Sequence, residues 1–480
     1  MRGVSPAGGP SVAVVDRPWH ASADPLLAGG AALGAGVGIV LAVGGAASGG
    51  LYMTIAGAAL SASGLAVLLA AGWLESLALV ALSVPLPALV STGEVRVAAA
   101  APVAAIVVAS WIVRAGTSGR RIESGSLPRG ALTLLLVAFL FAAPFAGSLA
   151  VALREILNLS VLLALLVVAI DLLGSEVEGR ERVVGLLAVV GAVTGGAAVL
   201  ETIGVIPGEF PRSGTPFNRA ALAFGQPNPL ALLLALCIPL LVHRRATASN
   251  LPARLAWTAA LAAGVLGLVG TFSRGAWLAL VLGAGALLAA RAWRPAVRIW
   301  MATLAVALVL DAASGGALRD TAVRTVGDWV VEQRALLLWA GVLMFFDHPL
   351  VGVGPGGFAT ELDVYAPMLP RLFDLKPTPH NAYVQMAAET GVVGLLAFVV
   401  FLVAVFRVFR GDLVRAEDPH ERSLRAALLW CLGILVVSGF ALWPFAHGTG
   451  EAVVLILAVG LARDPSRRER VRAARPRAVA

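Results

Sequence analysis

The sequence predicts an all-α protein, a polytopic bundle of transmembrane helices with a large, partly helical outer loop. Two observations carry this prediction. Hydrophobic residues make up 59% of the chain and charged residues only 13%, which leaves too little polar surface to cover a soluble core of 480 residues. The apolar residues also fall in blocks, many of them long enough to cross a hydrocarbon layer of about 30 Å as a helix. A lipid-facing β-barrel would show alternating apolar and polar residues instead.

The apolar blocks predict about 12–14 membrane spans. In chain order they are 26–46, 51–71, 75–91, 95–113, 131–149, 155–173, 183–200, 220–242, 255–272, 276–290, 296–312, 391–409, 426–445 and 450–462. The third block is the weakest, because Pro85 and Pro87 interrupt it, although bundled spans tolerate proline. The last block is short.

These blocks divide the chain into six expected regions. They are a cytoplasmic lead at 1–25, an N-terminal transmembrane bundle at 26–200, transmembrane helices with outer-face arginine motifs at 201–312, a large outer loop at 313–390, C-terminal transmembrane helices at 391–462 and a basic cytoplasmic tail at 463–480. The lead lacks the apolar core of a cleavable signal peptide.

The positive charges predict the orientation of the bundle. The net charge is +8, and a cytoplasmic tail would place most of the 36 Lys and Arg residues in loops on the same side. Both termini are therefore expected in the cytoplasm, with the chain embedded in the lipids of the inner (plasma) membrane. Nucleic acid is not expected as a partner, because anionic headgroups explain the basic tail and no aromatic–basic platform accompanies it.

The sequence predicts no cofactor and no metal site. Cys237 and Cys431 lie in apolar runs and are expected to be buried as small apolar side chains. Two thiols cannot form a four-ligand zinc site. No convincing Asp-x-Asp metal pair appears in the expected outer loops, and the glycines between Gly352 and Gly357 match neither a Walker loop nor a dinucleotide fingerprint.

Polar residues that could carry chemistry concentrate at the predicted outer face. Arg274 lies in a tight turn between two spans, beside Ser273 and Trp277, and could bind a ligand or anchor the turn to headgroups. Arg334 and Trp339 could share one face of an amphipathic stretch near 328–346, although Val331 and Leu338 could pack there as well.

Two further segments belong to this face. Gly354 and Gly356 could let backbone N–H groups approach an anion, or could simply form a tight turn. His380 and Asn381 directly precede a span. A lone histidine is usually structural, but several outward arginines face this one. Arg212, Arg219 and Asn228 surround the start of the span at 220–242, as a substrate contact or as a kink at helix entry.

Three of these motifs together resemble the O-antigen ligase and polymerase family. His380-Asn381, nine residues and then Gly391-x-x-Gly394 is similar to the H-N-x9-G-x-x-G signature of that family. The turn from Ser273 to Trp277 and the stretch from Arg334 through Trp339 to Gly354 resemble the family in the same order and spacing. The resemblance covers roughly residues 200–410, although family ligases commonly show about twelve spans.

The resemblance implies a membrane-embedded glycosyltransferase at the outer face of the inner membrane. Its donor would be a glycan linked to a polyprenyl (undecaprenyl) diphosphate, and its acceptor the hydroxyl of a glycan or glycolipid. A ligase would use the lipid A–core of lipopolysaccharide or another envelope glycan, and a polymerase another glycan repeat. Arg274 and Arg334 would bind the diphosphate and His380 would act at the acceptor hydroxyl, roles that suit arginine forks and imidazole. Metal-independent transfer with inversion at the anomeric carbon is the accompanying hypothesis.

The candidate residues fall into two sets. The catalytic set is His380, Arg274 and Arg334, and the substrate-binding set is Arg212, Arg219, Asn228, Ser273, Trp277, Trp339, Gly354, Gly356 and Asn381.

Two alternatives come from other functional classes. A transporter for a small anion or a lipid-linked sugar would need charged groups near the membrane midplane, but Glu75, Glu155 and Asp171 lie near the ends of their blocks. A noncatalytic scaffold would not require Arg274, Arg334 and His380 to converge.

Overall fold

A computed structural model describes residues 73–462 apart from twelve gaps. The gaps are 86–87, 93–94, 99, 119–121, 123–124, 176–178, 209, 211–217, 291, 314–327, 366–377 and 442–448. The first two expected spans, 26–46 and 51–71, and the terminal regions 1–25 and 463–480 lie outside the described residues, as does Arg212.

The described residues form an all-α bundle, as the sequence predicted. The α-helices are α3 (Trp73–Ser83), α4 (Ala100–Ser118), α5 (Arg129–Ala142), α6 (Leu149–Ser175), α7 (Gly179–Thr202), α8 (Pro227–Thr247), α9 (Leu251–Gly270), α10 (Arg274–Gly283), α11 (Gly285–Ala289), α12 (Trp293–Ala313), α14 (Asp328–Asp347), α15 (Gly357–Tyr365), α16 (Ala382–Arg415), α17 (Pro419–Ser438) and α18 (Thr449–Leu461). Two short 3-10 helices cover Ala143–Phe145 and Leu222–Phe224, and one hairpin pairs β1 (Ala88–Thr92) with β2 (Val95–Ala98).

The bundle is that of a multi-pass membrane protein. Among the described residues, five helical segments are long and apolar enough to cross a membrane: 149–174, 179–202, 227–247, 251–270 and 382–415. Four shorter apolar helices add to them. Large apolar side chains such as Leu157, Val193 and Leu255 are exposed on these helices, which suits contact with lipid and would be costly in water. Among the described residues, fewer helices are therefore long and apolar enough to cross a membrane than the 12–14 spans expected for the whole chain.

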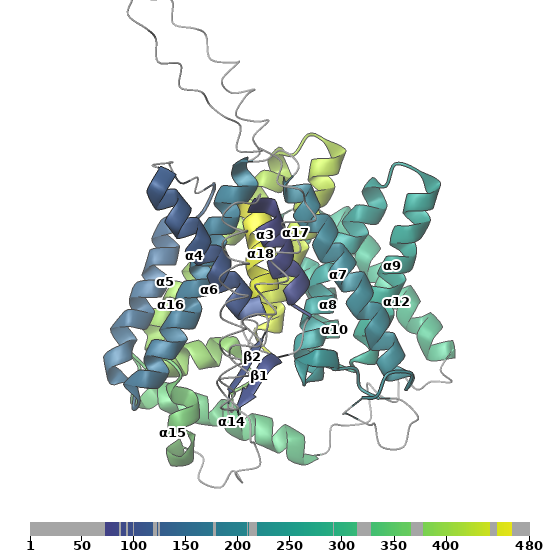
Figure 1. Cartoon of the computed structure of the whole chain (residues 1–480). Coiled ribbons are helices and arrows are strands. Elements are labelled where there is room, and N and C mark those ends of the chain that lie inside the picture. Colours follow the sequence, from purple (N-terminus) through teal and green to yellow (C-terminus); the bar gives the residue numbers. More distant parts are fainter. Residues whose placement is uncertain are drawn as a thin grey trace, which may run out of the picture.

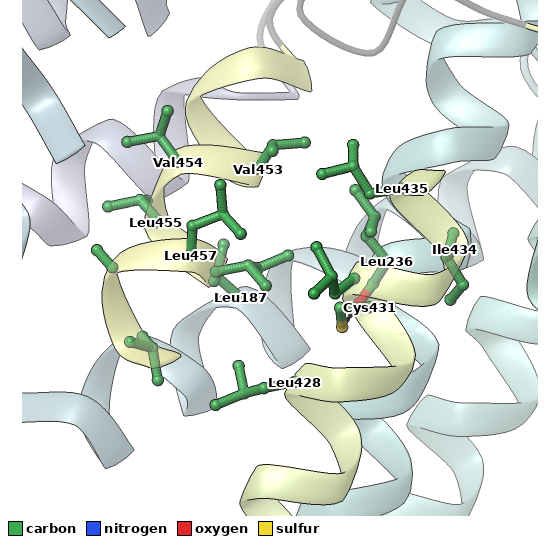
Figure 2. Close-up of a cluster of buried hydrophobic side chains, with 14 of the residues drawn as sticks. Leu187, Leu236, Leu428, Cys431, Ile434, Leu435, Val453, Val454, Leu455 and Leu457 are labelled. Atoms are coloured by element: carbon green, nitrogen blue, oxygen red, sulfur yellow. Dashed lines mark hydrogen bonds between the residues drawn. The ribbon is translucent and has the colours of Figure 1, made fainter. Parts of the chain in front are cut away.

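One part of the main hydrophobic core lies where α7, α8, α17 and α18 meet (Figure 2). Leu187, Leu236 and Leu428 lie there in one cluster with Val453, Leu455 and Leu457 of α18, a helix whose residues are all buried. Cys431 lies in the same cluster, and its thiol donates to the carbonyl of Leu236 at 3.3 Å. Both cysteines are free and buried, which confirms their predicted role as small apolar side chains.

Glycines let two pairs of helices pack with their backbones in contact. A Cβ on Gly267 of α9 would meet the backbone of Gly195 in α7, and a Cβ on Gly433 of α17 would meet the backbone of Gly283 in α10. Close approach through small residues is the usual way in which membrane helices gain van der Waals contact. The second pair fixes α10, which carries Arg274, against α17.

The expected span at 75–91 is wrong. α3 ends at Ser83, and the hairpin follows, with Val90 opposite Val97 and Thr92 opposite Val95. Pro85 explains the end of the helix, because proline removes a backbone donor and disfavours helical geometry in the residue before it. The hairpin, α14 and α15 gather at one end of the bundle, which we call the loop end (Figure 1).

The segment at 313–390 is partly helical, as predicted, because α14 and α15 lie in it. α16 begins at Ala382, earlier than the expected start at 391, so the residues after Asn381 already belong to a helix. This helix breaks at Gly391, whose φ of 62° and ψ of −164° are not helical.

Candidate functional site

The turn between α9 and α10 presents Arg274 at the loop end. Arg274 is the first residue of α10, and Ser273 precedes it as the N-cap. Ser273 Oγ donates to Asn228 Oδ1 at 2.9 Å instead of capping the helix. The start of α8 thereby holds the start of α10, and two predicted substrate-binding residues lie in direct contact.

Arg219 approaches the same turn from the preceding loop. Its Nε donates to the carbonyl of Thr271 at 3.3 Å, and the neighbouring Ala220 N donates to Gly270 O at 2.9 Å. The indole of Trp277 donates to Leu268 O at 3.0 Å. Arg219 and Trp277 therefore brace the turn that carries Arg274.

Sequence reasoning missed Glu201, which orders this loop from the end of α7. Its buried carboxylate accepts the backbone N–H groups of Ala221 at 3.0 Å and Leu222 at 2.8 Å. The signal was an acidic residue at the end of an apolar block, which is costly to bury unless it is hydrogen-bonded.

α14 carries Arg334 toward the start of α16. Leu337, Ala340 and Met344 form the buried stripe of α14, and a Cβ on Gly341 would lie 2.7 Å from the Val384 side chain. Arg334 lies about one helical turn before Leu337, although its own side chain is exposed. Trp339 lies outside this stripe and is 59% exposed. Five residues, or about 140° around the helix axis, separate it from Arg334, so the two do not share a face as the sequence suggested.

His380 lies immediately before α16 on a strained backbone. Its φ is 52°, a left-handed value that is unfavourable for a residue with a Cβ. Asn381 is the N-cap of α16, and its Oδ1 accepts from Tyr383 N and Val384 N, both at 3.0 Å. Asn381 thus fixes the helix start and, through the chain, the position of His380.

The end of α17 is the common support for these two helix starts. Ala382 N donates to Gly439 O at 2.7 Å, which ties α16 to α17 beside His380. On the other side, a Cβ on Gly275 would lie 3.1 Å from the Cβ of Ala441, which places α10 beside the same segment. Segments distant in sequence thereby bring Arg274 and His380 to one end of the bundle.

The three predicted catalytic residues interact electrostatically. Although Arg334 is exposed overall, partial desolvation of its guanidinium lowers its pKa, and the positive charge of Arg274 lowers that pKa further. Burial of the imidazole lowers the pKa of His380 to about 4, and the charge of Arg334 contributes to the same shift. Two cations therefore lie close together beside an imidazole that is neutral at pH 7.

Backbone strain clusters around this site. Among the described residues, the non-glycine residues with positive φ are Leu222 (46°), Phe272 (51°) and His380 (52°). Leu222 precedes α8 and Asn228, and Phe272 precedes Ser273 and Arg274. Such conformations cost about 1–3 kcal/mol each and concentrate where function requires a fixed geometry.

The glycine-rich loop packs into the break of α16. Val353 N donates to Ala388 O, and Val392 N donates to Pro349 O, both at 2.8 Å, so the loop pairs with backbone groups around the break. Gly352 and Gly354 have positive φ, and a Cβ on Gly354 would meet Ala146. These contacts support the interpretation of the glycine-rich loop as a tight turn.

Glu389 holds the same loop by its side chain. Its buried carboxylate accepts from Gly356 N at 3.0 Å and from Gln385 Nε2 at 3.3 Å. The N–H of Gly356 is thus used within the protein, which favours a structural role for this glycine over anion binding.

The arrangement can bind an anion and accept a proton at one place. Arg274 and Arg334 supply guanidinium donors suited to phosphate oxygens, and the neutral imidazole of His380 can accept a proton from a hydroxyl. Among the described residues, neither arginine forms an ion pair with a carboxylate, so an anionic ligand would relieve their mutual repulsion.

Comparison with protein families gives a match over part of the chain. Residues 259–399 match the family model described as O-antigen ligase. The match spans Arg274, Arg334 and His380 and confirms the family resemblance of the sequence, over a narrower range than the expected 200–410. No curated protein matches the chain.

Proposed function

We propose that this chain, whose residues 259–399 are similar to the O-antigen ligase family, transfers a glycan from an undecaprenyl-diphosphate carrier to an acceptor hydroxyl. The reaction would occur at the loop end, facing away from the cytoplasm at the inner membrane. The basic loops at the opposite end support that orientation, with both termini in the cytoplasm.

One observation carries the proposal. Two arginines without carboxylate partners among the described residues converge with a neutral histidine, although 60 residues separate Arg274 from Arg334 and 46 separate Arg334 from His380. A structural role would pair such cations with acids. A diphosphate, which carries several negative charges, satisfies both guanidinium groups at once.

The proposed transfer is a single displacement. The acceptor oxygen forms a bond to the anomeric carbon, the bond from that carbon to the diphosphate oxygen breaks, and its electron pair leaves with the diphosphate. Arg274 and Arg334 stabilise the charge that develops on this leaving group. His380 takes the proton of the attacking hydroxyl. Direct displacement inverts the anomeric configuration, and no metal ion is required if the arginines neutralise the diphosphate.

The remaining candidates have supporting roles in this scheme. Arg219, Ser273, Trp277 and Asn228 hold the turn that presents Arg274. Asn381 positions His380. Trp339 is exposed on α14 and available for contact with glycan or lipid. Arg212 is proposed as a further contact on sequence grounds alone.

The test is glycan transfer by purified full-length protein. The donor is a polyprenyl-diphosphate-linked glycan, and the acceptors are a lipid A–core glycolipid and a glycan repeat, offered separately. Transfer that is lost in His380→Ala and Arg274→Ala supports the proposal, and the acceptor used distinguishes a ligase from a polymerase. Folded protein that transfers to neither acceptor would overturn the proposal and favour a transporter.

Metal independence needs its own arm of the experiment. Transfer that continues after treatment with a chelator supports the arginine mechanism. Loss of transfer that Mg²⁺ restores would overturn it, because a hard cation would then be neutralising the diphosphate.

A further inference from the structure

The end of the bundle opposite the loop end contains a cluster of metal-ligand side chains. Glu181 lies in the first turn of α7, His243 in the last turns of α8 and His420 in the first turn of α17. α8 carries Asn228 in its first turn and His243 fifteen residues later, so this cluster lies about 22 Å along the helix from the candidate transfer site.

The ligand atoms have the spacing that a small metal ion requires. Glu181 Oε2 lies 3.7 Å from His243 Nε2 and 3.7 Å from His420 Nε2. The ligand atoms of all three residues lie within 4.8 Å of one another. Tetrahedral Zn²⁺, with bonds of about 2.0–2.1 Å, needs ligand atoms roughly 3.4 Å apart, so small side-chain shifts would complete the geometry.

His243 is oriented as metal-binding histidines are. Only 1% of its surface is exposed. Its Nδ1 lies 3.0 Å from Ser423 Oγ, which fixes the ring, while its buried Nε2 has no hydrogen-bond partner among the described residues. A buried nitrogen without a hydrogen bond is unfavourable, and a hydrogen bond on the other ring nitrogen is the usual outer-shell arrangement of a metal-bound imidazole.

Neighbouring charges are compatible with a bound cation. Arg244 Nη1 donates to Glu181 Oε2 at 3.1 Å and orients the carboxylate, whose terminal torsion is broad enough to turn one oxygen toward an ion. Arg180, which directly precedes Glu181, pairs with Glu421 at 3.2 Å, so its charge is compensated.

We propose that Glu181, His243 and His420 bind one divalent transition-metal ion of the zinc type. Two imidazoles and one carboxylate suit Zn²⁺, Ni²⁺ or Cu²⁺ better than Ca²⁺ or Mg²⁺, which prefer oxygen ligands. Water would fill the fourth position. The ion would join the ends of α7, α8 and α17, helices that meet in the core of the bundle, and it would take no part in the chemistry at the loop end.

Cobalt binding tests this site directly. Full-length protein, purified without a histidine tag and stripped with a chelator, is titrated with Co²⁺, whose visible spectrum reports tetrahedral coordination. We expect one Co²⁺ per chain, displacement by Zn²⁺ and a higher thermal unfolding temperature with either metal bound. His420→Gln and Glu181→Gln should weaken binding at least 10-fold. His420 is partly exposed, so His420→Gln should fold even if a substitution of the buried His243 does not.

His348→Gln is the matched control, because His348 is an exposed histidine near the loop end. Binding unchanged in this control and lost in the cluster variants supports the site. No bound ion in the wild-type protein, or equal binding by wild type and cluster variants, would overturn it. Either result is independent of glycan transfer, so the site and the proposed function can fail separately.

Discussion

The arginines at the two ends of the bundle differ in whether they pair with carboxylates. At the end that carries Glu181, each buried guanidinium has a carboxylate: Arg180 and Arg425 contact Glu421 at 3.2 and 2.7 Å. At the loop end, Arg274 and Arg334 lie close enough for one charge to lower the pKa of the other, and neither pairs with a carboxylate among the described residues. The paired arginines contribute to the fold, whereas the repulsion between Arg274 and Arg334 is what the proposed diphosphate would relieve.

The two ends of the bundle also differ in backbone geometry. The positive-φ residues Phe272 and His380 lie beside the candidate catalytic groups at the loop end. At the opposite end, in contrast, α9 and α17 begin with Asn250 and Asp418 as regular N-caps. Positive φ at Phe272 and His380 therefore costs stability at the loop end, although Asn381 caps α16 there as regularly as Asn250 and Asp418 cap their helices.

The largest expected effect separates the two kinds of arginine. Arg274→Ala and Arg334→Ala should each lower transfer by about 10²–10³-fold, because each removes a donor to the leaving group, while the protein still inserts and folds. Arg334→Lys should also fail if two parallel hydrogen bonds are needed. Initial rates and the elution profile of each variant measure both properties.

Two variants at the opposite end complete this comparison. Arg180→Ala should lower the free energy of unfolding by about 1–3 kcal/mol, since it removes one of the two arginines that contact Glu421, but folded protein should remain active. Arg245→Ala, which removes an exposed arginine bonded to Thr258, should change neither property. Equal loss of activity in Arg245→Ala and Arg274→Ala would abolish the distinction between the two ends.

The next effect concerns protonation of His380. Because burial and Arg334 lower its pKa to about 4, the free protein keeps this imidazole neutral well below pH 6.5. If it is the base, kcat/KM should persist to about pH 5 and fall near the lowered pKa. The limb for kcat should lie at higher pH, since a bound diphosphate offsets the charge of Arg334. An acid limb of kcat/KM at pH 6.5–7 would count against His380 as the base.

The same shift predicts how stability depends on pH. The unfolded chain binds a proton at His380 near pH 6.5 and the folded chain only near pH 4, so this residue lowers stability progressively as pH falls through that window. His380→Gln should remove this contribution. Thermal unfolding of both proteins between pH 7 and 4.5 measures the difference, and parallel curves would contradict it.

A smaller effect tests how the loop end is built. Gly391→Ala should lower the free energy of unfolding by about 2–3 kcal/mol, because φ is 62° and a Cβ would meet the backbone of Leu350. Gly196→Ala is the control: nothing lies within 4 Å of its Cβ, and alanine in a helix is favoured by about 1 kcal/mol. Similar results for both glycines would remove the structural account of the α16 break.

The helical bundle could be predicted from the sequence, and the candidate residues could be selected from it, for physical reasons. Long apolar blocks indicate membrane helices because the thickness of the bilayer sets their length. Arginine and histidine at the ends of these blocks are conspicuous because the chain contains few charged residues. Local signals could not give pairings across the fold. The docking of the Gly352 loop onto Ala388, the bracing by Glu201 and the meeting of Glu181 with two histidines depend on helix packing.

The hairpin shows a different limit. Residues 88–98 are apolar enough to read as parts of two spans, and hydrophobicity alone does not distinguish a short strand from a helix segment. Pro85 and Pro87 were the available signal, and tolerance of proline in bundled spans weakened it.

The smallest expected effect distinguishes the two faces of α14. Trp339 is 59% exposed, so Trp339→Ala should change the free energy of unfolding by no more than about 0.5 kcal/mol. Leu337 is buried one turn after Arg334, and Leu337→Ala should cost about 2–4 kcal/mol. If Trp339 contacts the donor, its replacement should raise the KM for donor a few-fold with kcat retained. An unchanged KM would indicate that the exposed face of α14 around Trp339 contacts lipid. Arg334 would then be the residue of this helix that binds the ligand.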